Sequence, residues 1–267
     1  MATLTLTHRQ HREAEYYRQF TRLNPVDTVD FAPVLSDERR PWSPYWRLCQ
    51  RVRDLRTAGP QRLLDFGCGW GIASVTFAKL GFAVEGFDIA DANIAASQRL
   101  AEKYELADRC RFRVMPAEKL DYPDACFDVV VGIDVLHHVE LPLALTELRR
   151  VLKPGGVALF KEPFVAPVLE RIRTSPLVEY LVPRAKSYEK HVHITDDERK
   201  LTRQDAQLLA QAFEVVSVDY FSLANRLARL MPRHYPTLMR IDHLLFRLCP
   251  PLRHLGDVRI MQYRRAA

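Results

Sequence analysis

The chain has 267 residues, of which 48% are hydrophobic and 27% charged, and its formal net charge at pH 7 is +6. This length can build one large domain with a sizeable core, and no apolar run approaches the roughly 18 residues of a membrane span. The five cysteines are widely spaced and form no C-x-x-C pair, which argues against a zinc or redox site and favours reduced thiols.

The N-terminal part of the chain predicts helices. Residues 1–17 have no apolar segment before a small-residue cleavage site, so we expect no secretory signal and a cytoplasmic protein. Residues 11–23 and 45–56 have helical patterns and are joined by a loop that contains prolines. We therefore expect residues 1–58 to form an N-terminal helical cap.

The central part of the chain, residues 61–162, alternates strand and helix patterns. Short runs rich in valine, leucine, isoleucine and phenylalanine predict buried strands at residues 62–67, 83–88, 110–115, 127–134 and 156–162. Apolar residues at helical spacing, followed by glycine or by Pro154, predict helices at residues 71–81, 91–106 and 141–156. This alternation predicts a doubly wound α/β fold with a largely parallel sheet, which binds ligands at the carboxyl ends of its strands.

The C-terminal part predicts two more strands, at residues 213–221 and 258–264, which would complete a seven-stranded sheet with helices on both faces. Between them, residues 235–249 carry leucines and an isoleucine at helical spacing with arginines interspersed. We expect residues 59–267 to form the core, with substrate-side helical insertions at about residues 163–200 and 222–257.

The positive charge is concentrated in residues 222–267, which contain nine arginines and two aspartates. A solvated helix face is one interpretation. Alternatively, the apolar stripe flanked by arginines contacts an anionic membrane or a lipid-like or acidic substrate. Nucleic acid is not an expected partner, because no aromatic and basic RNA-binding signature is present.

The stretch LLDFGCGWG, residues 63–71, places three glycines at every second position after a predicted strand. Such a loop brings bare backbone amides close to a ligand. A mononucleotide P-loop is excluded, because no lysine followed by serine or threonine is present. A dinucleotide loop requires G-x-G-x-x-G, and Asp65, two residues before the first glycine, would repel a pyrophosphate but attract a cationic amine. Asp88 ends the second predicted strand, where a carboxylate can accept both ribose hydroxyls.

Four segments, LLDFGCGWG, VEGFDIA, MPAEKLDYPDACFDVVVGIDVLHHV and LKPGG, resemble the successive motifs of the class I S-adenosylmethionine-dependent methyltransferases. The resemblance covers about residues 61–162 and implies a Rossmann-like fold, with S-adenosyl-L-methionine as cofactor and S-adenosyl-L-homocysteine as product. It implies that the cofactor contacts Asp65, Gly67, Cys68, Gly69, Gly71, Asp88, Ile89 and Ile133. Pro116 stands where the family has an aspartate at the adenine, so we expect Ala117 or Glu118 to supply that contact.

Aromatic and histidine side chains complete the expected site. Tyr17, next to Tyr16, resembles the aromatic lid that family members fold over the cofactor; packing in a helix core is the alternative. His138 in the stretch LHHV and His193 in the insertion are the candidate catalytic residues, because imidazole titrates near neutrality. The alternative for His138 is a purely structural histidine, and the alternative for His193 is a solvated loop histidine. No histidine pair has the i, i+4 spacing of a helical metal site, so we expect no metal.

These observations favour a methyltransferase that acts on an oxygen, carbon or nitrogen of a small, partly hydrophobic molecule, such as a secondary metabolite, a quinone or a lipid. A non-catalytic methyltransferase-like binding or assembly protein would keep the same fold, and Pro116 is the one sign of a damaged site. A NAD(P)-dependent oxidoreductase would share the sheet, but Asp65 and the glycine spacing argue against it. The sequence does not indicate an oligomeric state.

Overall fold

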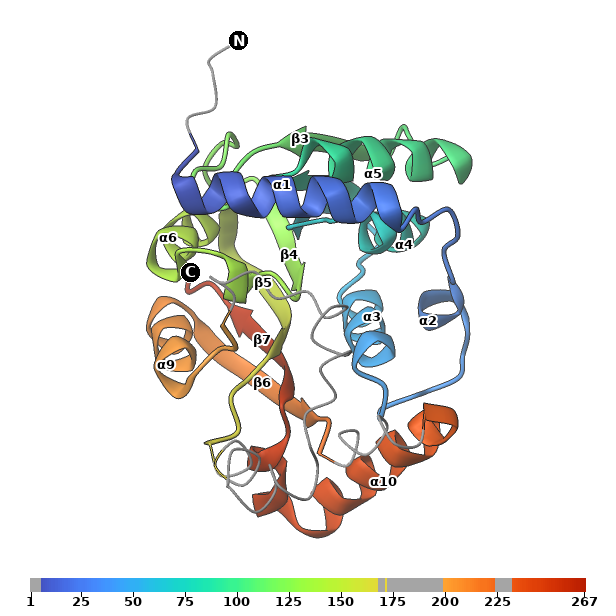
Figure 1. Ribbon diagram of the computed structural model, residues 1–267, viewed down its shortest axis with the longest axis vertical. Coiled ribbons are helices and arrows are strands. Elements are labelled where there is room, and N and C mark those ends of the chain that lie inside the picture. Colours follow the sequence, from blue (N-terminus) through green and yellow to red (C-terminus); the bar gives the residue numbers. More distant parts are fainter. Residues whose placement is uncertain (1–5, 168–170, 172–198, 224–231) are drawn as a thin grey trace.

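The computed structural model describes residues 6–167, 171, 199–223 and 232–267, and its centre is a seven-stranded sheet of order β3-β2-β1-β4-β5-β7-β6 (Figure 1). The strands are β1 (Arg62–Phe66), β2 (Ala83–Asp88), β3 (Cys110–Val114), β4 (Phe127–Ile133), β5 (Leu152–Pro163), β6 (Glu214–Phe221) and β7 (Val258–Arg264). Strand β7 is antiparallel to both of its neighbours, β5 and β6, and the other neighbouring pairs of strands are parallel. The predicted α/β fold with a mostly parallel sheet is confirmed.

Helices cover both faces of this sheet. Their bounds are α1 (His8–Leu23), α2 (Ala32–Leu35), α3 (Pro44–Asp54), α4 (Ile72–Lys79), α5 (Asp91–Lys103), α6 (Leu141–Val151), α9 (Arg203–Ala212) and α10 (Tyr235–Leu248). Single 3₁₀ segments lie at η1 (Leu136–His138), η3 (Pro232–His234) and η4 (Pro250–Leu255). The predicted insertion at residues 163–200 lies largely outside the described residues, and so does its candidate His193.

Alternation of side chains along the strands creates two hydrophobic cores. Leu64 and Phe66 of β1 are fully buried on the face covered by α6 and α9, whereas Leu63 is fully buried on the face covered by α3, α4 and α5. Each such side chain contributes roughly 1.5–3 kcal/mol when it is removed from water. The alternation also decides that Asp65 faces α4.

The predicted boundary between α6 and β5 differs most from the structure. We expected a helix over residues 141–156 and a strand from residue 156, but α6 ends at Val151 and β5 begins at Leu152. Leu152 pairs with Phe127 at the start of β4, and the register then shifts before Val129. Gly155, with φ of 73°, takes the left-handed conformation within this irregular segment.

The N-terminal helices have two different positions. Helix α3 packs against β5 and β7, and its Leu48 and Val52 belong to the hydrophobic core. Helix α1 instead crosses the loops that follow β2, β3 and β4 (Figure 1). It begins with a capping box, in which Thr7 and Gln10 each accept a hydrogen bond from the other's backbone N–H. A division between cap and core at residue 58 remains a proposal.

Candidate functional site

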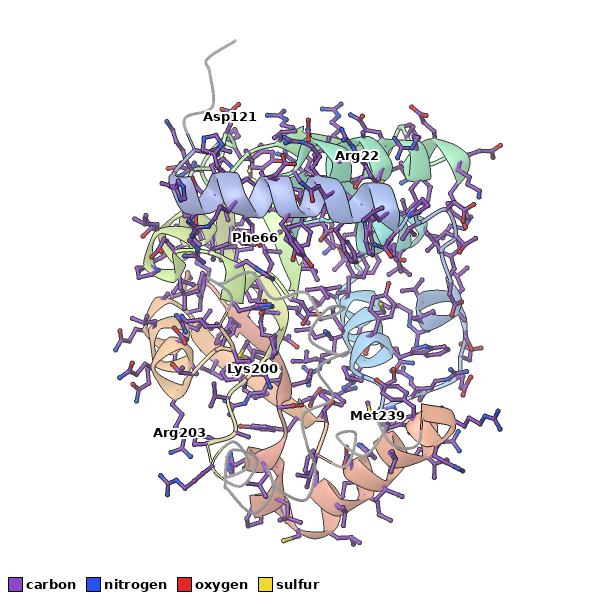
Figure 2. All side chains as sticks on the ribbon, in the orientation of Figure 1. Arg22, Phe66, Asp121, Lys200, Arg203 and Met239 are labelled. Carbon is purple, nitrogen blue, oxygen red and sulfur yellow. The ribbon has the colours of Figure 1, made fainter. Side chains whose placement is uncertain are left out.

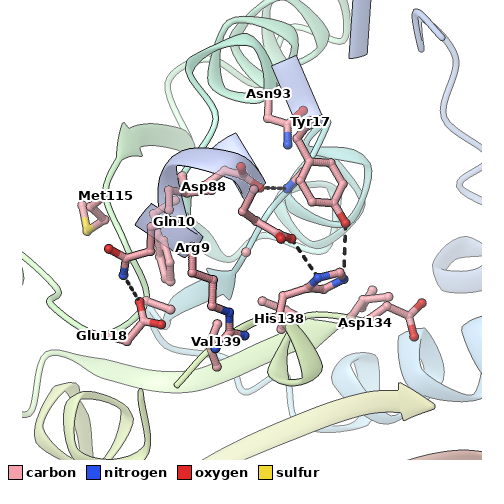
Figure 3. A pocket seen from close by; sticks show the side chains of 18 residues that line it. Arg9, Gln10, Tyr17, Asp88, Asn93, Met115, Glu118, Asp134, His138 and Val139 are labelled. Carbon is pink, nitrogen blue, oxygen red and sulfur yellow. Dashed lines mark hydrogen bonds and ion pairs between the residues drawn. The ribbon is translucent and has the colours of Figure 1, made fainter. Parts of the chain in front are cut away.

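A cavity lies beneath α1, where the chain leaves the carboxyl ends of the central strands (Figure 3). Nine of the residues predicted for the site line it: Tyr17, Gly67, Gly69, Asp88, Ile89, Ala117, Glu118, Ile133 and His138. They come from five separate segments of the chain. Ligands of open α/β sheets bind at this strand edge.

The glycine loop forms one wall of the cavity. Gly67 and Gly69 have φ of 71° and 51°, in the left-handed region that side chains with a Cβ rarely adopt. A Cβ on Gly67 would lie 2.4 Å from Cγ2 of Val135, which also lines the cavity. Glycine is therefore required for the turn and for the close approach of the backbone to Val135.

Asp88 presents a carboxylate at the end of β2, and the surrounding backbone holds it in place. Its Oδ2 accepts a hydrogen bond of 3.0 Å from the Gly69 N–H, and its Oδ1 accepts one of 2.9 Å from the Ala90 N–H. Burial raises the pKa of Asp88, the two N–H groups oppose that shift, and the charge of Glu13 adds to it. The remaining lone pairs of this carboxylate can accept hydroxyl donors from a ligand in the cavity.

Asp65, Cys68 and Gly71 do not line the cavity, and their contact with the ligand stays a prediction. Asp65 is 2% exposed and accepts a hydrogen bond of 2.6 Å from the Ser74 hydroxyl of α4. Burial raises the pKa of Asp65 to about 6. Cys68 is buried with its Sγ 3.9 Å from Oγ of Ser97, and Gly71 is the N-cap of α4. These three residues therefore support the loop from behind.

Helix α1 closes the cavity through polar contacts at several points along its length. The Gln10 side chain donates a hydrogen bond of 2.8 Å to Glu118, and Arg18 forms an ion pair of 3.0 Å with Asp91. Because the Glu118 side chain already accepts a hydrogen bond from Gln10 of α1, Ala117 is the better candidate for the predicted contact with adenine. About 180 Å³ remains free beneath the helix, less than the roughly 300–1,000 Å³ of most ligand pockets.

The two adjacent histidines of η1 have different surroundings. His138 lines the cavity, with its Nδ1 2.8 Å from Oε1 of Glu13 and its Nε2 3.3 Å from the Tyr17 hydroxyl (Figure 3). His137 is buried, with its Nδ1 2.7 Å from Oε2 of Glu162. Oε1 of Glu162 accepts hydrogen bonds from the backbone of Val135 and Leu136, so this pair holds the turn together. Only His138 is placed to meet a ligand.

Glu13 is one of the cavity-lining residues that sequence reasoning missed. It is 7% exposed and lines the cavity beside His138. A signal was present, because Glu13 precedes Tyr17 by one helical turn, so the two side chains share a helix face. Within the described ranges, no three histidine, cysteine, aspartate or glutamate side chains gather closely enough to hold a metal ion.

Comparison with known families matches residues 64–160 to the model described as methyltransferase domain. The ubiquinone biosynthesis O-methyltransferase of Cereibacter sphaeroides (strain KD131 / KCTC 12085) is 44% identical over 99 residues, which are 37% of this chain and 39% of that protein. The protein of the same name from Psychrobacter cryohalolentis is 37% identical over 112 residues, 41% of this chain and 43% of that protein. The chain spans about two fifths of the length of these curated relatives.

Solved structures share the fold over nearly the whole chain. The [4+2]-cyclase SpnF has a TM-score of 0.61 and 20% identity, with 99% of each chain covered. Geranyl diphosphate C-methyltransferase from Streptomyces coelicolor A3(2) has a TM-score of 0.60 and 18% identity, with 97% of this chain and 99% of that chain covered. Since these names describe different reactions on one architecture, the activity has to be argued from the site.

Proposed function

We propose that the chain is an enzyme of the class I S-adenosylmethionine-dependent methyltransferase family, which transfers a methyl group to a small, partly hydrophobic acceptor. The observation that carries this proposal is the cavity between the Gly67 to Gly69 backbone and the Asp88 carboxylate, under α1. Such a cavity offers hydroxyl acceptors and bare peptide at the loop, and the guanidinium that lines it, that of Arg9, is paired with Glu140 at 2.7 Å, which argues against a nicotinamide dinucleotide.

The residues present fit S-adenosyl-L-methionine. Asp88 would accept the ribose hydroxyls, Gly67 and Gly69 would face the methionine part, and Ile89 and Ala117 would lie against the purine. When bound, this cofactor supplies an activated methyl group on a sulfonium. The small free volume implies that α1 side chains, above all Tyr17, move aside to admit it.

The chain's own contribution to methyl transfer is alignment, exclusion of water and removal of a proton. Helix α1 covers the cavity and keeps bulk water out. His138 would accept the proton of an acceptor hydroxyl, since its ring faces the cavity, and Glu13 at 2.8 Å would stabilise the resulting imidazolium. The role of His193, outside the described residues, remains a second proposal.

The acceptor is proposed to be a hydroxylated quinone-like ring. The names of the relatives, ubiquinone biosynthesis O-methyltransferase, support oxygen as the methylated atom and a quinone as the class of acceptor. A cytoplasmic location, with membrane contact through residues 222–267, belongs to the same proposal, because a quinone with a hydrophobic chain dissolves in the bilayer. None of the described helices has the length and apolar character of a membrane-spanning segment.

Replacing Asp88 with alanine is expected to weaken binding of S-adenosyl-L-homocysteine by about 2 kcal/mol, roughly thirtyfold, because charge-assisted hydrogen bonds to the ribose are lost. Isothermal titration calorimetry measures this. The exposed Asp108→Ala variant is the matched control and should bind normally. An unchanged affinity of Asp88→Ala, or a wild-type chain that binds NADH in preference to S-adenosyl-L-homocysteine, would contradict the proposal.

Replacing His138 with glutamine is expected to lower kcat about hundredfold, the usual contribution of a general base. Affinity for S-adenosyl-L-homocysteine should change little, because Asp88 and the glycine loop remain. The assay follows transfer of a radiolabelled methyl group to a quinol that carries a hydrophobic chain, and the exposed His234→Gln variant is the control. Equal loss of kcat in both variants would remove His138 from the mechanism.

A further inference from the structure

Helix α10 exposes a row of large apolar side chains on the face turned away from the sheet. Ile241, Leu244 and Leu248 are 43%, 55% and 74% exposed, and they lie three and four residues apart on one side of the helix. The opposite side packs inward through the buried Leu238 and Met239. The exposed row therefore has no role in the core of the part of the chain that the structure describes.

Arginines lie beside this row. Arg240 and Arg247 lie beside it on α10, and Arg253 follows on η4; all three are exposed. The guanidinium group of Arg240 lies 4.9 Å from the ring of Trp42, and that of Arg253 lies 5.6 Å from the ring of Tyr220, so each lies against an aromatic ring.

The carboxylates of Asp242 and Asp219, which lie close to the row, already form a hydrogen bond or ion pairs with other groups. The sole acid within α10 and η4 is Asp242, which is buried and accepts a hydrogen bond of 2.9 Å from the Leu223 N–H. Asp219, on the adjacent β6, pairs with Arg47 and Arg51 at 2.8 Å each. The exposed surface of α10 and η4 is consequently apolar along its centre and positively charged at its side.

A surface depression of about 270 Å³ lies between α10, η4 and β6, and most of its charged lining residues are basic, with Asp219 the acid among them. Arg47, Arg247, Arg253 and His243 contribute to its lining. Burial lowers the pKa of His243, and the charges of Arg247 and Arg47 lower it further, which is the response expected in a positive local potential. A phosphate group would be attracted to this depression.

We propose that the outer face of α10, together with η4, docks on the surface of an anionic phospholipid bilayer. The row would enter the boundary between headgroups and acyl chains, while the arginines extend to the phosphates. Fourteen residues of helix span about 21 Å, too short to cross the roughly 30 Å hydrocarbon layer, so α10 would lie in the plane of the interface.

Charge argues for a membrane and against a second copy of the chain. In a twofold dimer formed by this face, Arg240, Arg247 and Arg253 would face the same three arginines of the partner, and their repulsion would oppose association. An anionic lipid surface instead neutralises each of them. Figure 2 shows α10, with Met239, and α1, with Arg22, toward opposite ends of the long axis, so docking through α10 leaves α1 free.

The first test is flotation of the full chain with vesicles of phosphatidylcholine, alone or mixed with phosphatidylglycerol. We expect binding to the mixed vesicles only. Leu244→Asn should reduce that binding about tenfold, because the apolar contact is lost. Leu143→Asn is the matched control, since Leu143 of α6 is 56% exposed against 55% for Leu244, and it should bind as the wild type does.

The second test removes charge. Each of Arg247→Gln and Arg253→Gln should weaken binding about fivefold, whereas Arg22→Gln and Arg99→Gln on the far helices should not. High salt should weaken binding of the wild type. The proposal would be overturned if the wild type bound both vesicle types equally or bound neither. It would also be overturned if Leu244→Asn changed the oligomeric state of the protein and left vesicle binding unchanged. Neither vesicle test uses the cofactor. The outcome of these tests therefore does not depend on whether the methyltransferase proposal is correct.

Discussion

The Gly67→Val variant is expected to lose measurable binding of S-adenosyl-L-homocysteine, a fall of more than about a hundredfold, or about 3 kcal/mol. The reason is steric. A Cβ at this position would lie 2.4 Å from Cγ2 of Val135, and the backbone φ of 71° is unfavourable for a β-branched residue. The loop must then shift, and the cavity wall that faces the cofactor shifts with it. Calorimetric titration measures the loss.

A matched control separates the clash from backbone strain. Gly155 has a similar φ of 73°, but no heavy atom lies within 4 Å of a Cβ built there. Gly155→Val should therefore lose some stability, seen as a lower Tm, and keep the affinity of the wild type. Gly67→Ala is tested alongside, in case valine prevents folding. A folded Gly67 variant with normal affinity would show that the glycine loop does not face the ligand.

The Asp65→Asn variant is expected to be more stable than the wild type at about pH 8, by about 3 kcal/mol in the free energy of unfolding. Burial raises the pKa of Asp65 to about 6 in the folded chain, from 3.8 ordinarily. The folded state thus holds this proton more tightly than the unfolded state does. Its stabilising effect is complete below the unfolded pKa and is lost as the pH rises through about 6. Asparagine has no proton to lose and can still accept the Ser74 hydrogen bond.

The expected gain therefore depends on pH, falling to about 1 kcal/mol near pH 4.5. Urea unfolding at both pH values measures it. Asp121→Asn is the control, because the Asp121 side chain is 95% exposed and its replacement should leave stability unchanged at both pH values. A gain for Asp65→Asn that does not vary with pH would contradict the assigned pKa. Cofactor affinity should change little, since Asp65 does not line the cavity.

The order of strands and helices could be read from the sequence, because it depends on local periodicity. All seven strands lie where runs of branched and aromatic residues predict them, and the helices between them follow the spacing of apolar residues. Residues 152–156 were wrongly predicted to be helical because they have a helix-ending pattern. In the structure they belong to β5, where a register shift and the left-handed conformation of Gly155 accommodate the segment. Local pattern does not encode the pairing partner.

The sequence by itself determined the glycine loop, the acid that ends β2 and the arginine-rich character of the C-terminal segment, since each is a property of consecutive residues. Only the tertiary structure decided which side chains meet. Glu13 and Tyr17 reach His138 across more than a hundred residues because α1 folds over the strand ends, and Asp65 turns to α4 because β1 packs between two cores. Likewise, only packing shows that Leu238 faces inward and Leu244 outward. These contacts depend on how distant elements bury their apolar faces against one another, and no short stretch of sequence contains that information.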